Sequence, residues 1–294
     1  MLFDIIESQL NEPLFENYDV FSQTVLSAEY ELNQMGAVAL GLRCSNMSQA
    51  FSLAYRCALQ SLLPQLATNK WAAMCVTEPS GNHPKNIESQ LTGFAVNGHK
   101  SFVTMATLAE QLLVIVKQEE KSDRPQLKAV LIDSAQAGVE LVQFPPLGML
   151  KDIPHGKVTF KNADADILAG DGYSEYSKPF RTLEDIYAVL VASSFILSMA
   201  KRFEINYIVV QKALGIITQL VSLPLVPSSW MHLQVEESLK SFNDLTELFE
   251  RHFEPLPDSI KNEWLADKKI FSIAQSARES RLKKAIESIG LTKG

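Results

Sequence analysis

The pattern of apolar and polar residues divides the chain into three zones. Over residues 1–71 and again over 179–294, apolar residues recur at helical spacing, which predicts a helical N-terminal domain and a C-terminal antiparallel helix bundle. Between them, over residues 72–178, short runs of β-forming residues alternate with turn residues, which is typical of a small antiparallel barrel or sandwich. We therefore predict an α+β fold made of a helical domain, a β-barrel domain and a helical-bundle domain.

The central zone carries the clearest strand pattern. Asn97-Gly98 separates the runs Leu91–Val96 and Lys100–Thr104 and predicts a β-hairpin, because both residues of such a turn need a positive φ. Further strands are expected at residues 72–76, 112–116, 128–132, 139–144 and 157–160.

The C-terminal zone predicts three long helices, over about Thr182–Leu220, Ser229–Phe253 and Asp258–Ile289. The longest uncharged apolar run lies between Asp185 and Lys201 and holds 15 residues. That is short for a bilayer span and suits a buried core helix. We expect no membrane span.

Composition narrows the class of protein. The 294 residues are 46% hydrophobic and 21% charged, as in a globular chain, and the net charge is −7. An acidic chain without a basic stripe is a poor nucleic-acid binder. The three cysteines, Cys44, Cys57 and Cys75, form no CxxC pair and are odd in number, which favours a reducing compartment. The N-terminus lacks the basic region of a signal peptide, so we expect a cytoplasmic protein.

The sequence lacks the motifs of several common kinds of functional site. The histidines are His83, His99, His155, His232 and His252, and none has the spacing of a metal ligand set, so we expect no metal site. The chain also has no GxGxxG or GxxxxGK[ST] phosphate loop and no GxSxG nucleophile elbow.

A set of short segments nevertheless forms a pattern. In chain order they are Leu63–Ala67, Cys75–Pro79, Val96–Thr104, Leu147–Met149 with Gly156–Phe160, and Ile167–Tyr173. These segments resemble, in the same order, motifs of the acyl-CoA dehydrogenase family, and the resemblance extends over roughly residues 60–215. Several motifs in sequence are far more specific than one, and they imply the fold of that family.

The resemblance implies a flavin site. In the family, flavin adenine dinucleotide (FAD) lies between barrel and bundle, where the protein fixes the ring and excludes water. By resemblance, Val76 and Thr77 bond the ring edge, Phe102 packs on the ring, and Thr104 donates a hydroxyl near N5. The alternative is that Val76 and Phe102 are barrel core and that both threonines cap backbone at strand ends.

At two positions that would contact the phosphates of FAD, this sequence differs from the pattern of the family. Where relatives have Gly-Ser-Asp, this chain has Asn82-His83-Pro84. His83 can donate to a phosphate, but Pro84 has no N–H; the alternative is a surface loop without a ligand. Gln211 stands where the family has an arginine that reaches the cofactor of a neighbouring subunit, so a charge-assisted contact is lost.

A third departure concerns the catalytic base. The sequence ends before the loop that usually carries the family's glutamate, and some relatives place the base on the first bundle helix, which here is Glu184 or Asp185. Arg181, one turn earlier, is a candidate for a thioester or phosphate anion. The alternative is that Thr182 caps the helix and that the two acids favour its N-terminal end.

Three functions remain open. The first is a flavin-dependent oxidoreductase that removes hydrogen from the α and β carbons of acyl-CoA or a similar thioester, in a homodimer or homotetramer like its relatives. The second is a non-catalytic binding or assembly protein that has lost FAD. A reduced-flavin monooxygenase of the same fold is the third.

Overall fold

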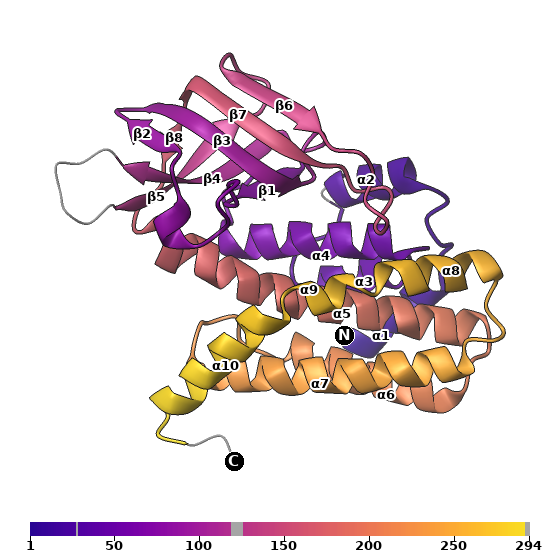
Figure 1. Cartoon of the computed structure of the whole chain (residues 1–294). Coiled ribbons are helices and arrows are strands. Elements are labelled where there is room, and N and C mark those ends of the chain that lie inside the picture. The colour runs from indigo at the N-terminus through magenta and orange to yellow at the C-terminus, as the bar shows by residue number, and fades with distance from the viewer. Residues whose placement is uncertain (28, 119–125, 292–294) are drawn as a thin grey trace. The chain divides into compact units, whose positions relative to one another are not determined.

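The chain is described by a computed structural model that covers residues 1–27, 29–118 and 126–291 (Figure 1). It forms two compact units. The helical unit comprises Met1–Ala58, Gly148–Leu150 and Thr182–Gly294, and the sheet unit comprises Leu59–Leu147 and Lys151–Arg181. The predicted division into three domains stays a prediction.

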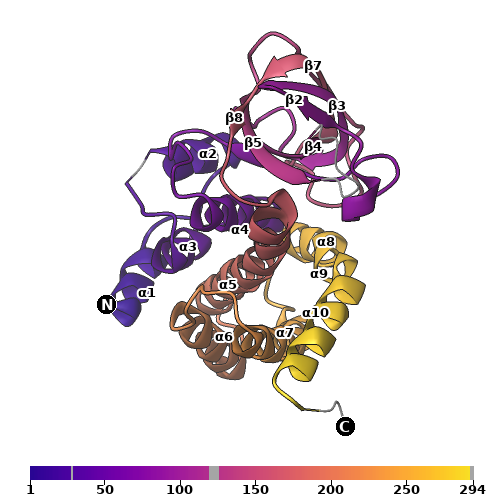
Figure 2. The ribbon, with the colours of Figure 1, turned by 90° about the vertical axis from the view of Figure 1, so that its left-hand side faces the viewer.

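The sheet unit is built on one curled, eight-stranded sheet (Figure 2). Its strands are β1 (Ala72–Cys75), β2 (Gln90–Thr92), β3 (Ala95–Thr104), β4 (Gln111–Gln118), β5 (Leu127–Asp133), β6 (Val139–Gln143), β7 (His155–Asp164) and β8 (Asp166–Ile167). The order is β6-β7-β3-β2-β4-β5-β8, with β1 paired to β4. The pairs of β4 with β1 and with β2 are parallel, whereas the prediction was an antiparallel sheet.

The predicted hairpin at Asn97-Gly98 is wrong. The turn lies at Gly93-Phe94, where Thr92 pairs with Ala95 and Gly93 has φ +61°. Gly98 lies inside β3 with φ +135°, and a Cβ there would meet the Cα of Ser89 at 2.6 Å. The glycine therefore allows two segments of backbone to approach closely rather than forming a turn.

A β-bulge in β3 decides which side chains face inward. The register with β7 shifts between Lys100 and Val103, so one extra residue is accommodated on β3. Lys100 and Val103 are both buried, and Phe102 between them points outward with φ +52°. A bulky residue in this region of φ is a strained conformation.

The helical unit contains most of the helices. They are α1 (Leu2–Asn11), α2 (Tyr18–Leu26), α3 (Gln34–Gly41), α4 (Met47–Leu62), α5 (Lys178–Arg202), α6 (Tyr207–Val221), α7 (Ser229–His252), α8 (Asp258–Asp267), α9 (Ile270–Ile273) and α10 (Gln275–Ser288). The ends of α4 and α5 belong to the sheet unit, which also holds a short 3-10 helix, Pro84–Asn86, and a π-helical turn, Gly172–Ser177.

Two of the three long helices predicted from the sequence are interrupted. The stretch 182–220 breaks between α5 and α6, where Glu204 has φ +52° and the side chain of Asn206 caps α6 by accepting the N–H of Ile208. The stretch 258–289 divides into α8, α9 and α10. The helix predicted over 229–253 is confirmed as α7.

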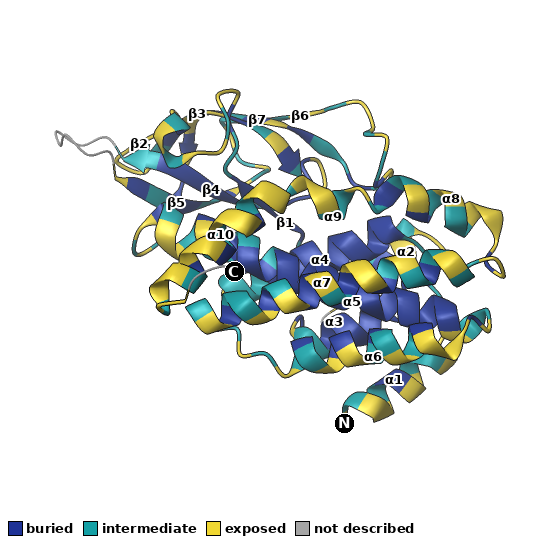
Figure 3. Cartoon of the chain, turned by 60° about the horizontal axis from the view of Figure 1, so that its bottom comes forward, coloured by how far each residue is buried: buried dark blue, intermediate teal, exposed yellow. Residues whose placement is uncertain are grey.

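The apolar run in α5 is a core helix, as predicted. Gly172–Arg202 is long and apolar enough to cross a membrane by length and composition alone, but 94% of its most apolar window is buried inside the protein. Figure 3 shows α5 almost wholly buried, in contrast to the largely exposed α10. Within the helical unit, Trp264 packs against Phe249 and Phe195, with ring centroids 5.2 and 6.3 Å away.

We predict that Gly98→Ala destabilises the protein by about 1–3 kcal/mol more than Gly93→Ala. Both positions have a positive φ, but a Cβ at residue 93 meets nothing within 4 Å, whereas at residue 98 it collides with Ser89. Urea unfolding of the two variants and the parent measures the difference. Equal free energies of unfolding for both variants would show that the close approach at Gly98 is unimportant.

Candidate functional site

Glu78 and Lys100 form a buried ion pair in the sheet unit. The Nζ of Lys100 is 2.5 Å from Oε1 of Glu78, and the two side chains are 0% and 2% exposed. Lys100 comes from the bulge of β3, and Glu78 follows the end of β1. Because neither charge reaches water, each stabilises the other, and loss of one leaves an unpaired charge in the interior.

The pair shifts the pKa of both groups. Burial acts to raise the pKa of Glu78, but the hydrogen bond and charge of Lys100, with backbone N–H donors, outweigh it, so the net direction is downward. Burial lowers the pKa of Lys100, and Glu78 opposes only part of that shift.

The carboxylate of Glu78 also organises the loop that follows it. Its oxygens accept the N–H of Glu88 at 2.8 Å, and the N–H and Oγ of Ser89 at 3.1 and 2.8 Å. The N–H of Glu78 donates to the carbonyl of Gly81 at 3.1 Å, and the N–H of Gly81 donates to the carbonyl of Glu78 at 2.8 Å. One carboxylate thus holds both ends of the loop 78–89 together.

Three residues predicted to contact the flavin, Val76, Thr77 and Phe102, lie next to this ion pair. The carbonyl of Val76 accepts Nζ of Lys100 at 3.4 Å, and the carbonyl of Thr77 accepts the N–H of Ser101 at 2.7 Å. Phe102 is the next residue. The residue is 65% exposed, so the alternative interpretation of Phe102 as barrel core is wrong.

Thr104 ends β3 and faces His155 at the start of β7 in the antiparallel register. Side chains of directly opposed residues lie on the same face of a sheet. His155 is half-buried, with Nδ1 3.1 Å from the carbonyl oxygen of Ile153. Burial lowers its pKa despite that contact, which favours the neutral imidazole.

The predicted phosphate loop is closed largely by its own hydrogen bonds. Nδ1 of His83 accepts the N–H of Lys85 at 3.2 Å, and Asn86 bonds Ser80 through both backbone and side chain. A guanidinium N–H of Arg181 donates to the carbonyl of Asn82 at 3.4 Å. The sheet unit therefore brings His83 and Arg181, predicted separately from the sequence, to the same loop.

In the helical unit, the two candidate bases differ in their surroundings. Asp185 is 4% exposed, and its carboxylate accepts hydrogen bonds from Arg278 at 2.9 and 2.7 Å and from Arg281. Its two oxygens are thus both occupied by guanidinium groups of α10. Glu184, one residue earlier on α5, is half-buried.

Gln211 lies on α6 and is exposed. Its neighbour Lys212 is paired with Asp244 of α7 at 3.0 Å. Lys212, the neighbour that could replace the charge of the family's arginine, is therefore already engaged in an ion pair.

No group of three or more His, Cys, Asp or Glu side chains that could hold a metal is found among the residues the structure describes. The three cysteines are free and buried. Burial raises the pKa of Cys57 and Cys75 to about 12 and also raises that of Cys44.

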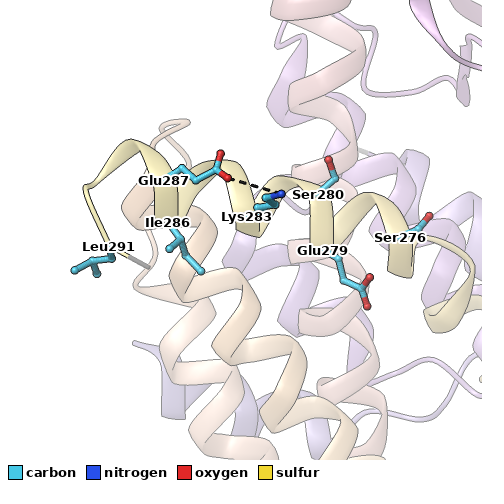
Figure 4. Close-up of a pocket in the computed structure, with 7 residues that line it drawn as sticks. All are labelled: Ser276, Glu279, Ser280, Lys283, Ile286, Glu287 and Leu291. Atoms are coloured by element: carbon cyan, nitrogen blue, oxygen red, sulfur yellow. Dashed lines mark ion pairs between the residues drawn. The ribbon is translucent and has the colours of Figure 1, made fainter. Parts of the chain in front are cut away.

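A surface hollow of about 540 Å³ lies elsewhere, along α10 (Figure 4). Its lining includes Ser276, Ser280 and Leu291, and the ion pair of Lys283 with Glu287 spans one helical turn at 3.9 Å. None of the predicted site residues lines it.

Comparison with known proteins places the sheet unit in a class. Residues 73–163 match the family model described as acyl-CoA dehydrogenase, middle domain. A search of curated protein sequences finds no match. The resemblance read from the sequence motifs is confirmed: residues 73–163 are similar to the middle domain of acyl-CoA dehydrogenases.

Solved structures extend the likeness to the rest of the chain. A structure of PigA with FAD and proline is 16% identical, with a TM-score of 0.66 and coverage of 98% of each chain. An acyl-CoA dehydrogenase from Geobacillus kaustophilus is 12% identical, with a TM-score of 0.65 and coverage of 96% of this chain and 92% of that one. Butyryl-CoA dehydrogenase from Megasphaera elsdenii is 10% identical, with a TM-score of 0.64 and coverage of 98% and 97%. The chain has the acyl-CoA dehydrogenase fold, with N-terminal helices, a central curled sheet and C-terminal helices, as predicted.

Three residues of this region were missed by sequence reasoning. Glu78 and Lys100 lie inside the motifs that carried the resemblance, yet no role was assigned to either. Phe144, whose ring contacts that of Phe102, lies just beyond β6 and had no motif of its own. A signal did exist for Lys100, since period-two alternation from Val96 through Gly98 points it inward.

We predict that Lys100→Met destabilises the protein by about 3–5 kcal/mol, because it leaves the carboxylate of Glu78 buried without its cation. The double variant Glu78→Gln/Lys100→Met removes both charges while keeping an acceptor for the loop N–H groups, and it recovers most of that loss. Urea unfolding at neutral pH measures both. A single variant as stable as the parent would contradict the role given to the pair.

The same variants test the pH dependence. Because the folded-state pKa of Glu78 is lowered, its contribution to stability is present above its ordinary pKa of 4.5 and is lost as the pH falls through the lower folded value. The free energy of unfolding should therefore fall more steeply below pH 4.5 in the parent than in the double variant.

Proposed function

We propose that this chain binds FAD and oxidises an acyl thioester such as acyl-CoA at its α and β carbons. The observation that carries the proposal is the outward ring of Phe102, held at a positive φ beside Thr77 within an acyl-CoA dehydrogenase middle domain. A strained backbone conformation that exposes an aromatic ring lowers the stability of the fold. Such conformations are concentrated at functional sites, which supports a functional role for Phe102.

The ring end of the site fits a flavin. Val76 and Thr77 would bond the ring edge, Phe102 would pack on its face and Thr104 would supply a hydroxyl, which leaves one apolar surface with a few placed polar groups. When bound, FAD supplies the hydride acceptor. The residues named above would hold and orient its ring.

The phosphate end differs from the family pattern. Pro84 has no N–H, and Nδ1 of His83 is used within the loop. Cationic side chains lie there instead: Arg181 bonds the loop at Asn82, and Lys85 is exposed on it. We propose that Arg181 and Lys85 provide the positive charge that the phosphates need, and that His83 contributes a hydrogen bond from its other ring nitrogen, Nε2.

We propose Glu184 as the base that takes the α proton of the thioester. Asp185 is the weaker candidate, because both of its oxygens are engaged by arginines and proton abstraction would require breaking those contacts. In this assignment Asp185 anchors α10 to α5, and Glu184 carries the chemistry.

A non-catalytic relative without FAD is the second candidate. The self-closed loop at His83 and the exposed Gln211 in place of an arginine favour it. Under either function we propose a cytoplasmic protein that forms a homodimer or homotetramer, and light scattering of the purified chain tests the oligomeric state.

We predict that the purified protein is yellow, or takes up added FAD in stoichiometric amount, and that an acyl-CoA bleaches the flavin absorption under anaerobic conditions. Visible absorption during titration with FAD and then with acyl-CoA of several chain lengths is the measurement. A folded protein that takes up no FAD supports the non-catalytic candidate and rejects the enzyme.

The assignment of the base has its own control pair. Glu184→Gln should keep bound FAD but slow its reduction by about 10²–10⁴-fold, the usual contribution of a general base. Asp185→Asn should mainly lower the free energy of unfolding, because Arg278 and Arg281 lose their partner. The reverse outcome, with slow reduction only in Asp185→Asn, would move the base to Asp185.

A further inference from the structure

The ring of Phe102 has an aromatic neighbour from another part of the sheet unit. Phe144 follows the last residue of β6, and its ring centroid is 5.5 Å from that of Phe102 at an interplanar angle of 66°. This edge-to-face arrangement is a preferred geometry for two aromatic rings. Strands β6, β7 and β3, which carry the pair, lie side by side in Figure 1.

The backbone of Phe144 is restrained by a hydrogen bond at the residue itself and by two prolines that follow it. Its N–H donates to the carbonyl of His155 at 2.7 Å, which continues the pairing of β6 with β7 by one residue. Pro145 and Pro146 follow directly, and each has a φ locked by its own ring. Phe144 therefore presents its side chain from a rigid point.

Phe102 needs such a neighbour. The residue is 65% exposed, and exposed side chains change rotamer on the picosecond to nanosecond timescale. The bulge accounts for the position of its backbone but does not by itself set the rotamer of its side chain. Contact with Phe144 restricts that ring to the rotamers that preserve the edge-to-face pair.

We propose that Phe144 is a positioning residue of the flavin site: it does not touch the flavin but sets the tilt at which the ring of Phe102 meets it. This inference rests on the proposed function, since it requires a flavin against Phe102. It adds a residue that no sequence motif indicated, at a point about forty positions further along the chain.

The chain offers matched variants for the test. Phe144→Leu removes the ring but keeps an apolar side chain, and Phe144→Tyr restores a ring. Phe94, in the hairpin turn, is 71% exposed, which makes Phe94→Leu the control for loss of an exposed aromatic residue. Thermal unfolding of each variant establishes that it is folded.

FAD affinity and the visible circular dichroism of bound flavin are the readouts. Phe144→Leu should weaken FAD binding by about two- to tenfold and change the dichroism, Phe144→Tyr should restore both, and Phe94→Leu should change neither. In a Phe102→Leu background, Phe144→Leu should have no further effect, because it acts through Phe102.

Each other outcome overturns the inference. An unchanged affinity and dichroism in Phe144→Leu, or an equal effect in the Phe102→Leu background, shows that Phe144 does not position Phe102. If Phe144→Leu does not fold, Phe144→Met, which also lacks the ring, takes its place: altered dichroism supports the inference, and parental dichroism overturns it. If the parent itself takes up no FAD, the proposed function fails, and the inference falls with it.

Discussion

The sheet unit depends on the burial of two opposite charges against each other. The carboxylate of Glu78 and the ammonium of Lys100 are tolerable in the interior only as a pair, so the end of β1 and the bulge of β3 must meet. That meeting places Thr77 next to Ser101 and turns Phe102 outward. The same carboxylate fixes the loop 78–89. An electrostatic requirement of the interior thereby shapes a surface on which apolar and hydroxyl groups are exposed together.

Much of the fold could be predicted from periodicity, and the failures have physical reasons. The strand runs and α7 follow directly from apolar spacing, but Asn97-Gly98 satisfied the local preference for a turn while the glycine is needed for close approach to Ser89. Likewise the apolar pattern over 182–220 continues past the break at Glu204, because α5 and α6 both carry buried apolar residues at helical spacing. Local propensity does not encode what a residue will pack against.

The candidate site was predicted less completely than the fold. The motifs located Val76, Thr77 and Phe102, which the structure does bring together, and they identified a loop that contains His83. The part that holds these residues in place was not predicted, because Glu78 and Phe144 act through partners that are distant in sequence. Nor does the sequence show that Arg278 and Arg281, more than ninety residues away, occupy Asp185.

The burial of all three cysteines has a practical consequence. A thiol reacts as its thiolate, and Cys44, Cys57 and Cys75 are shielded from solvent and held in the protonated form by their raised pKa values. We therefore expect the native fold to react slowly with alkylating reagents and mild oxidants at neutral pH. A cysteine introduced on the surface would then be labelled in preference to the native thiols, so site-specific labelling should not require their prior removal.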